Sequence, residues 1–309
     1  MIGLSLSEKY YNEYGHLILS AAEELCPGLS SRISAGLAGE GSQCFGYDDA
    51  VSQDHDFAPG FCIWMASDDF SSYGTALQAV YDSLPGEFDG FSRQNIIARD
   101  RLGILSSDEF YGRFISSLQH DDDWLLIPEA NLAAAANGQI WKSGCTQFDD
   151  TRKLLLNFYP ESVLRKKLAA RAAIMSQAGQ YNLPRMLERS DHVAAALSAA
   201  RFTEAAISMV HLLCRRYTPF YKWAFRSLSC LAEESPLAQL TALELSKLPE
   251  ACILPGDDGK KEAFRITETI CAAAAAELNA QGFSETQSSF LQDHLADISR
   301  GEDFTYGYI

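Results

Sequence analysis

Two aspartates separated by one residue, Asp54 and Asp56, are the side chains whose spacing in this sequence is best suited to chemistry. They lie between two apolar runs, residues 33–37 and 57–65, which we expect to form strands. On a strand, residues two apart project from the same face, roughly 6–7 Å from each other, so the two carboxylates would point together and His55 away. Paired carboxylates repel unless they share a proton or hold a cation. Oxygen ligands of this kind favour Mg²⁺, and we therefore predict a Mg²⁺ site here.

A glycine-serine turn precedes the aspartate pair. Gly41 has no side chain, so its backbone can come close to a phosphate. Ser42 offers a hydroxyl group and a backbone N–H as hydrogen-bond donors. Since Mg²⁺ is often held by carboxylates together with substrate phosphates, Gly41 and Ser42 are candidate nucleotide-binding residues. Asp54 and Asp56 are the candidate metal ligands and catalytic residues.

Charge is unevenly distributed along the 309 residues. Residues 1–150 carry 7 Lys and Arg against 23 Asp and Glu, a net charge of −16, whereas residues 151–309 carry 18 of each. Within residues 152–226 there are 13 basic and 4 acidic residues, a net charge of +9. The acidic total argues against a long nucleic-acid partner, because phosphate binding needs a broad basic surface. A basic segment facing a carboxylate and metal site would suit one polyphosphate, and the alternative is that the two regions do not face each other.

The composition, with 47% hydrophobic and 21% charged residues, is typical of a soluble globular protein. Apolar runs are too short to span a bilayer, so no membrane partner is expected. The first residues lack the basic region and the long apolar core of a secretory signal. The eight cysteines are scattered without a Cys-x-x-Cys pair, which indicates free thiols in a reducing compartment. We expect a cytoplasmic protein.

The pattern of secondary structure changes near residue 150. Residues 1–150 alternate helical stretches, such as 7–25, with strand-like runs at 102–105 and 139–141. From residue 151 to residue 309 only helical periodicity is found. The sequence therefore predicts an α+β protein, in which a mixed sheet with flanking helices is followed by an all-α helical bundle.

Several segments of the chain carry more specific expectations. The acidic run 121–123 is interpreted as a solvated loop rather than a cation site, and residues 179–184 as a break between helices. We expect a loop over 249–259 and a helix over 284–299. The segment 192–214 is nearly apolar all round in its second half, which predicts a buried central helix.

The turn and the aspartate pair resemble the signature of the nucleotidyltransferase superfamily that includes DNA polymerase beta and the aminoglycoside nucleotidyltransferases. That signature is Gly-Ser or Gly-Gly, then a short loop, then Asp-x-Asp. Here Gly41-Ser42 is followed by eleven residues and then Asp54-His55-Asp56. In the second half, the run Arg-Tyr-Thr-Pro-Phe-Tyr-Lys-Trp at 216–223 is similar to a run in the helical domain of an uncharacterised bacterial family of this type.

The resemblance implies a nucleotidyltransferase-like catalytic domain over residues 1–150 and a helical domain over 151–309. It implies a Mg²⁺-dependent enzyme that moves a nucleoside monophosphate from a nucleoside triphosphate, with ATP as the expected donor, to a small-molecule acceptor and releases pyrophosphate. Catalysis of this kind needs charge neutralisation and in-line geometry more than covalent help. The alternatives are an enzyme that nucleotidylates proteins and a nucleotide-binding protein without catalytic activity.

Members of the superfamily usually supply a third carboxylate from a later strand. The expected strand at 102–105 carries no acid. Asp100 precedes it and Glu129 follows it, and we include Glu129 among the catalytic candidates. The alternative for each is an ordinary surface acid or an acid in the first turn of a helix.

The basic half offers three further candidates for nucleotide binding: Lys222, Arg216 and Tyr221. Lys222 lies between Tyr221 and Trp223, where a lysine could reach a triphosphate. Its alternative is a lysine that lies along an aromatic helix face. Arg216 closes the preceding helix, where the helix dipole favours a cation whatever the function.

Overall fold

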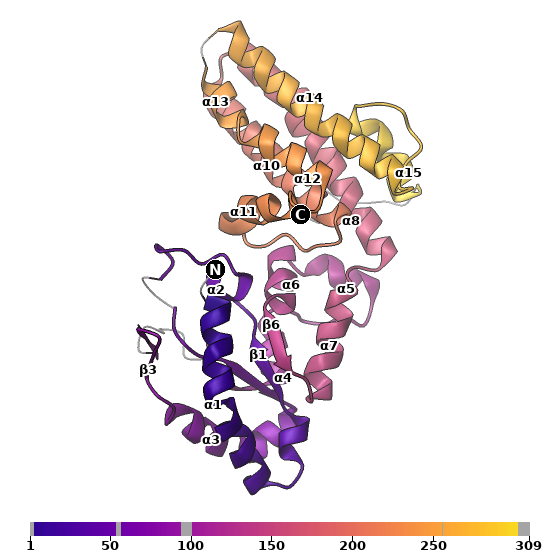
Figure 1. Ribbon diagram of the computed structural model, residues 1–309. Helices are drawn as coiled ribbons and strands as arrows, with labels where there is room; N and C mark the ends of the chain where they lie inside the picture. The colour runs from indigo at the N-terminus through magenta and orange to yellow at the C-terminus, as the bar shows by residue number, and fades with distance from the viewer. Residues whose placement is uncertain (1–2, 54–56, 94–100, 255, 302–309) are drawn as a thin grey trace. The chain divides into compact units, whose positions relative to one another are not determined.

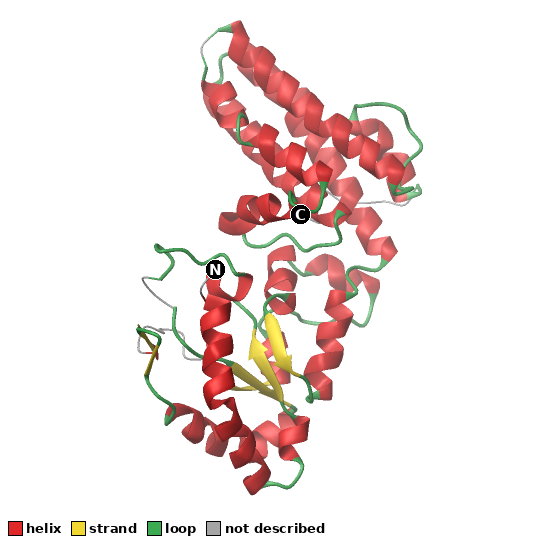
Figure 2. Ribbon diagram, in the orientation of Figure 1, coloured by secondary structure: helices red, strands yellow, loops and turns green. Residues whose placement is uncertain are grey.

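The computed structural model describes residues 3–53, 57–93, 101–254 and 256–301. The chain forms two compact units, each assembled from two stretches of sequence. Unit 1 comprises Met1–Ser116 and Asn131–Asn157, and unit 2 comprises Ser117–Ala130 and Phe158–Ile309. Unit 1 contains strands and helices, whereas the described part of unit 2 is helical, so the protein is α+β (Figures 1 and 2). The border predicted after residue 150 lies inside a helix of unit 1.

Strands and helices alternate along unit 1. The larger elements are α1 (Gly3–Leu25), β1 (Ser34–Leu37), α2 (Ser42–Phe45), β2 (Cys62–Met65), α3 (Ser67–Asp82), β5 (Gly103–Ser106), α4 (Ser107–Gly112), β6 (Gln139–Lys142) and α7 (Thr146–Leu156). Helix α6 (Glu129–Ala136) belongs to unit 1 from Asn131 onward, and its first two residues belong to unit 2. Two short strands, β3 (Glu87–Phe88) and β4 (Phe91–Ser92), pair separately, and a 3-10 turn, η1 (Leu29–Arg32), precedes β1.

Four short strands form the sheet of unit 1 in the order β5-β2-β1-β6. Strand β1 is antiparallel to β2 and β6, and β2 is parallel to β5. Ile63 of β2 belongs to the apolar cluster that includes Tyr10 of α1 and Leu77 of α3. Trp64, on the opposite face, stacks on Phe148 of α7 with 4.1 Å between ring centroids. Because β2 is buried on both faces, the sheet lies between two layers of helices (Figure 2).

Gly36 explains how β6 can pair with β1. A Cβ atom at this position would lie 2.2 Å from the carbonyl oxygen of Gln139. The register of the pair also shifts between Ala35 and Gly36. A glycine with no side chain admits this close approach and the accompanying bulge.

Unit 2 is built around the long helix α10 (His192–Leu213), which packs against helices from most of the unit. The other elements are α5 (Asp121–Leu126), α8 (Glu161–Ile174), the π-helix η4 (Met175–Asn182), α9 (Leu183–Glu188), α11 (Tyr221–Leu231), α12 (Pro236–Leu245), α13 (Leu248–Ile253), α14 (Asp257–Ala280), η5 (Leu291–His294) and α15 (Leu295–Ser299). Figure 1 shows α8, α10 and α14 as the long helices of this bundle.

Helix α10 has two different halves. By length and composition alone it could cross a membrane, so the expectation that every apolar run is too short to do so was wrong for this helix. Every residue from Ala205 to Leu213 is buried, however, which confirms the predicted buried helix for this half. In the first half, Val193 and Leu197 are exposed. The apolar composition of the second half is therefore explained by its place in the core of unit 2.

The acidic run was predicted to be a loop, and this prediction was wrong. Asp121, Asp122 and Asp123 form the first turn of α5. The carboxylate of Asp123 accepts the backbone N–H of His120 at 3.0 Å, and the backbone N–H of Asp123 donates to the carbonyl oxygen of His120 at 3.0 Å. Acids are favoured at this end of a helix, because the exposed N–H groups and the helix dipole attract negative charge.

Three other expectations for the second half were also wrong. The predicted break at 179–184 does not interrupt the helix, since α8 continues through η4 into α9. The predicted loop over 249–259 contains most of α13, with Pro249 in its first turn, where a missing N–H costs nothing. The predicted helix over 284–299 is helical only from Leu291, in η5 and α15.

All eight cysteines are free thiols, and Cys44, Cys62, Cys145 and Cys271 are buried. Burial raises the pKa of Cys44 to about 12. A thiol of such high pKa is neutral near neutral pH and is therefore a poor nucleophile.

Candidate functional site

A glycine turn connects β1 to the short helix α2. Gly39 has a φ of 120° and Gly41 a φ of 104°, values that side chains rarely allow. Asn137, which lies between α6 and β6, holds this glycine turn in place. Its Oδ1 accepts the N–H of Gly39 at 2.8 Å, and its Nδ2 donates to the carbonyl oxygen of Gly39 at 2.7 Å. The turn is thus a fixed piece of backbone rather than a loose loop.

The side of the turn that leads into α2 is fixed as well. The amide of Gln43 is buried and donates to the carbonyl oxygens of Gly3 and Ala58 and to the hydroxyl of Ser7, over 2.9–3.2 Å. These contacts hold the helix against α1 and against the chain that leads to β2. Ser42, the first residue of α2, remains partly exposed beside them.

A cation lies next to the turn. The Nη1 atom of Arg101 is 3.8 Å from the position that a Cβ atom on Gly41 would take. Its Nη2 atom is 3.5 Å from the Oε2 atom of Glu40, within the distance of an ion pair. Gly41, Ser42 and Arg101 therefore combine a bare backbone, a hydroxyl and a guanidinium group in one place. This is a suitable set of groups for the oxygens of a phosphate.

The predicted metal ligands Asp54 and Asp56, and His55 between them, lie outside the described residues. The flanking chain is described up to Gln53 and again from Phe57, whose side chain is buried. The strand expected over 57–65 is shorter than predicted, since β2 covers only Cys62–Met65. In the described part of the chain, no group of three or more His, Cys, Asp or Glu side chains could hold a metal ion.

Of the two candidates for a third carboxylate, Asp100 and Glu129, the structure describes Glu129. Strand β5 carries no acidic residue, as the sequence predicts, and Asp100 lies outside the described residues. Glu129 is 8% exposed and lies inside unit 2, where its carboxylate contacts the guanidinium group of Arg171. The Lys167 Nζ atom is 3.9 Å from the Oε1 atom of Glu129.

Two uncharged donors complete the surroundings of this carboxylate. The Ser208 hydroxyl lies 3.2 Å from Oε2 of Glu129 and accepts the Nε–H of Arg171 at 2.8 Å. The backbone N–H of Thr218 donates to Oε2 at 3.4 Å. Glu129 is thus held by donors from α8, α10 and the turn before α11. We name Glu129, Lys167, Arg171, Ser208 and Thr218 the Glu129 network.

The pKa values in the Glu129 network reflect a balance between burial and charge. Burial alone would raise the pKa of Glu129, but Arg171 and Lys167 outweigh it, so the pKa lies below its usual value. Burial lowers the pKa of Lys167 to about 8, although Glu129 opposes the change. Burial also lowers the pKa of His211, which bonds to Ile207 O and Ser227 Oγ as the satisfied core histidine expected from the sequence. At neutral pH the network therefore contains an ionised carboxylate whose two oxygens both accept from neighbouring donors.

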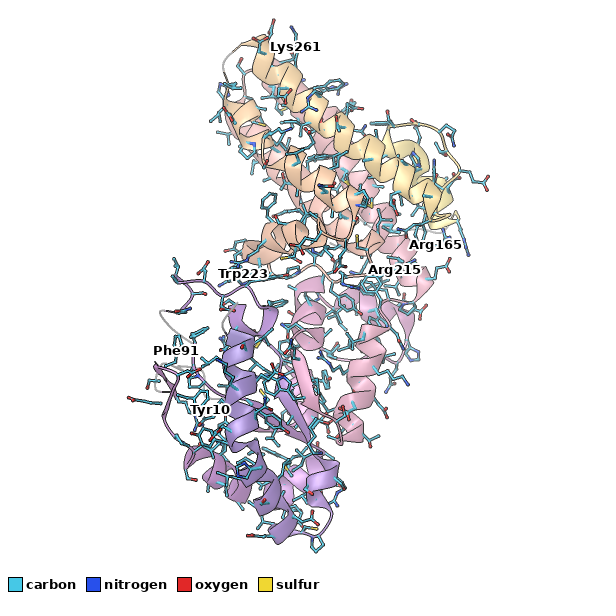
Figure 3. The ribbon with its side chains drawn as sticks, in the orientation of Figure 1. Tyr10, Phe91, Arg165, Arg215, Trp223 and Lys261 are labelled. Carbon is cyan, nitrogen blue, oxygen red and sulfur yellow. The ribbon has the colours of Figure 1, made fainter. Side chains whose placement is uncertain are left out.

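The three predicted nucleotide contacts of the second half lie in and before the first turn of α11. Tyr221 is 75% exposed. Lys222 is exposed, and its Nζ atom lies 5.2 Å from the ring centroid of Trp223, the residue of this turn that Figure 3 labels. Arg216 is exposed, and its Nη1 atom donates to the carbonyl oxygen of Arg215 at 3.3 Å. These side chains are accessible, unlike Glu129.

The polar segment at the end of η4 has divided roles. The Gln180 side chain is a structural link, because its amide donates to Glu268 and accepts the N–H of Leu291 at 3.0 Å. Tyr181 and Arg185 stack on each other, 3.4 Å from guanidinium carbon to ring centroid. Asn182 lines a shallow hollow of about 320 Å³ between η4 and α10.

Several residues of these two sites could not be recognised from the sequence. Arg101 and Asn137 carry no motif, and they reach the glycine turn only through the fold. Arg171 and Lys167 were visible only as members of a basic segment. A buried cluster of this kind has no sequence signal except charged residues at helical spacing in an otherwise apolar helix, as in α8.

A comparison with protein families finds one match: the model of a family described as a domain of unknown function (DUF4037) matches residues 124–224. This segment is about a third of the chain. No curated protein and no solved structure matches the chain. The matched segment contains every member of the Glu129 network and ends within the first turn of α11.

Proposed function

We propose that this protein binds a nucleoside triphosphate and Mg²⁺ and acts as a nucleotidyltransferase. The observation that carries the proposal is the glycine turn at Gly39–Ser42, held by Asn137 with Arg101 beside it. The turn precedes the pair Asp54 and Asp56 at the spacing of the nucleotidyltransferase signature. A nucleotidyltransferase-like fold of unit 1 is part of the same proposal, and the antiparallel β1–β2 pair that brackets the turn and the aspartates supports it.

The residues near the turn suit the phosphate end of such a ligand. Gly41 lets the backbone approach a phosphate oxygen, and Ser42 can donate from its hydroxyl. The guanidinium group of Arg101 supplies positive charge at the same place. Asp54 and Asp56 are the residues that would hold Mg²⁺, which is usually bound by one or two carboxylates together with phosphates.

The proposed reaction is an in-line displacement at the α-phosphorus. The oxygen of an acceptor hydroxyl forms a bond to the α-phosphorus and releases its proton to solvent. At the same time the bond from the α-phosphorus to the oxygen that bridges to the β-phosphate breaks, and that oxygen leaves with pyrophosphate. When bound, Mg²⁺ would neutralise charge on the phosphates. Arg101 and Ser42 would stabilise the oxygens around the α-phosphorus, and the fixed backbone of the turn would hold them in line. A small molecule is the proposed acceptor.

The placement of the acidic side chains supports a second candidate function. Strand β5 has none, and Glu129 is surrounded by cations and donors of unit 2 that use both of its oxygens. A protein that binds the nucleotide with Asp54 and Asp56 but does not transfer it would have this arrangement. We therefore keep a non-catalytic nucleotide-binding protein as the second candidate.

Transfer of label distinguishes the two functions. The purified protein is incubated with Mg²⁺ and a small-molecule or a protein fraction of a cell lysate, using ATP labelled in either the α- or the γ-phosphate. The proposed enzyme moves the α-label onto a small molecule and releases the γ-label as pyrophosphate. A protein that carries the α-label and not the γ-label would instead indicate protein nucleotidylation. Binding of ATP without any transfer would contradict catalysis and support the second function.

A further inference from the structure

An exposed aromatic surface marks the beginning of α11. Phe220 is 50% exposed, Tyr221 75% and Phe225 41%. The rings of Phe220 and Tyr221 lie 4.5 Å apart between centroids, with their planes tilted by 50°. Several large rings exposed together are costly in water, and such patches often mark binding sites.

The stretch of chain that carries these rings is positively charged. No Asp or Glu occurs between residues 205 and 232, and the cations of this stretch are Arg215, Arg216, Lys222 and Arg226. The whole chain, in contrast, has a net charge of −16. Among the described residues neither Arg216 nor Lys222 has a carboxylate within ion-pair distance. Aromatic rings interleaved with cations suit a ligand that is both aromatic and anionic.

The inner face of α11 is firmly anchored, so the outer face has a fixed geometry. Leu228 is fully buried, and the Ser227 hydroxyl is 2.8 Å from the Nε2 atom of His211. The turn before the helix is tied to Glu129 through the N–H of Thr218. A surface that is already ordered loses little conformational entropy when it binds a ligand.

We propose that this surface of unit 2 binds a mononucleotide, whose base stacks on Tyr221 beside Phe220 while its phosphates contact Lys222 and Arg216. The identity of the ligand rests on the proposed function, because that function supplies a nucleoside triphosphate. Stacking uses the flat face that every base has, so this surface accepts different bases with similar affinity. A long nucleic acid is disfavoured, because the rest of the chain is acidic and would repel its phosphates.

Calorimetry on the full chain in EDTA tests the proposal, since without Mg²⁺ the aspartates cannot bind a metal. AMP and ATP are the probes. We expect Tyr221→Ala to weaken AMP binding about 5- to 100-fold, the usual effect of removing one stacking ring, and Tyr221→Phe to keep it. Phe264→Ala is the matched control, because Phe264 is also an exposed ring of unit 2, 48% accessible, and its loss should change nothing.

Lys222→Ala separates the phosphate contact from the stacking. We expect this variant to bind ATP and inorganic tripolyphosphate more weakly, because both carry several negative charges, and to bind adenosine as tightly as wild type does. Tyr221→Ala should have the opposite pattern, with weaker binding of adenosine and unchanged binding of tripolyphosphate.

Three results would overturn this inference. They are the absence of AMP binding in EDTA, equal AMP affinity in the wild type and in Tyr221→Ala, and a short oligoadenylate that binds more tightly than AMP. Its failure is distinguishable from that of the proposed function. If Mg²⁺-dependent ATP binding requires Asp54 and Asp56 but not Tyr221, the proposed function stands and this surface has no part in it.

Discussion

The two units use charged and polar side chains in opposite ways. In unit 2, Glu129 and Arg171 are buried and satisfy each other together with Ser208 and Thr218. In unit 1, Asn137 satisfies the backbone of the glycine turn and leaves Ser42 partly exposed. An acid that is fully used by its own fold stabilises structure, whereas a hydroxyl beside a fixed glycine backbone is available to a ligand. Exposure, more than residue type, therefore separates the structural site from the candidate functional one.

The largest expected effect is on the stability of unit 2. Glu129→Gln removes the negative charge but keeps the shape, so Arg171 and Lys167 would remain buried without a counter-charge. Such a loss typically costs about 3–5 kcal/mol. Urea unfolding measures the change in free energy. Glu204→Gln on the exposed side of α10 is the control and should stay near wild type. A similar small change in both variants would contradict a structural role of Glu129.

A smaller effect is expected at the glycine turn. Asn137→Ala leaves the N–H and the carbonyl oxygen of Gly39 without their partner, which should cost about 1–3 kcal/mol. Because the turn then loses its fixed shape, we also expect weaker binding of ATP. Asn12→Ala, on the exposed face of α1, should change neither. If the Asn137→Ala protein bound ATP as tightly as wild type, the shape of the turn would have no effect on ATP binding, and the prediction would be wrong.

The smallest effect concerns pH and the Glu129 network. The pKa of Lys167 is lowered to about 8, below its usual value, so between pH 8 and 10 the unfolded chain binds the proton that the folded chain has lost. Stability rises with pH wherever the unfolded state holds more protons. From pH 7 to pH 9, the free energy of unfolding of wild type, measured in urea, should therefore rise by about 1 kcal/mol relative to that of Lys167→Met. A difference between the two proteins that does not change with pH would show that Lys167 titrates normally.

Regular elements with strong periodicity could be predicted from the sequence. Helix α1, strand β1 and the buried half of α10 follow directly from the spacing or density of apolar residues. The errors arose where one residue type has two meanings. Three aspartates suit a solvated loop and also the first turn of a helix, and Pro249 suits a loop and also a helix start.

The contacts of the candidate sites could not be predicted in the same way. Gly39 and Asn137 are 98 residues apart in the chain, and Glu129 and Thr218 are 89 apart. Nothing in the local sequence indicates such partners, since they depend on how the elements pack. The Gly41 and Ser42 motif, in contrast, was visible because the chemistry of a close backbone approach requires glycine itself.

The most direct test of the account is calorimetry of ATP binding with and without Mg²⁺, on wild type and on the double variant Asp54→Asn with Asp56→Asn. Asp49→Asn is the matched control, because it makes the same change of charge in the same segment. Its amide oxygen can still accept the N–H groups that Asp49 accepts from Val51 and Ser52. We predict that Mg²⁺ strengthens ATP binding in wild type and in the control, and that the double variant loses this dependence. ATP binding that ignores Mg²⁺, or that is unchanged in the double variant, would contradict the account.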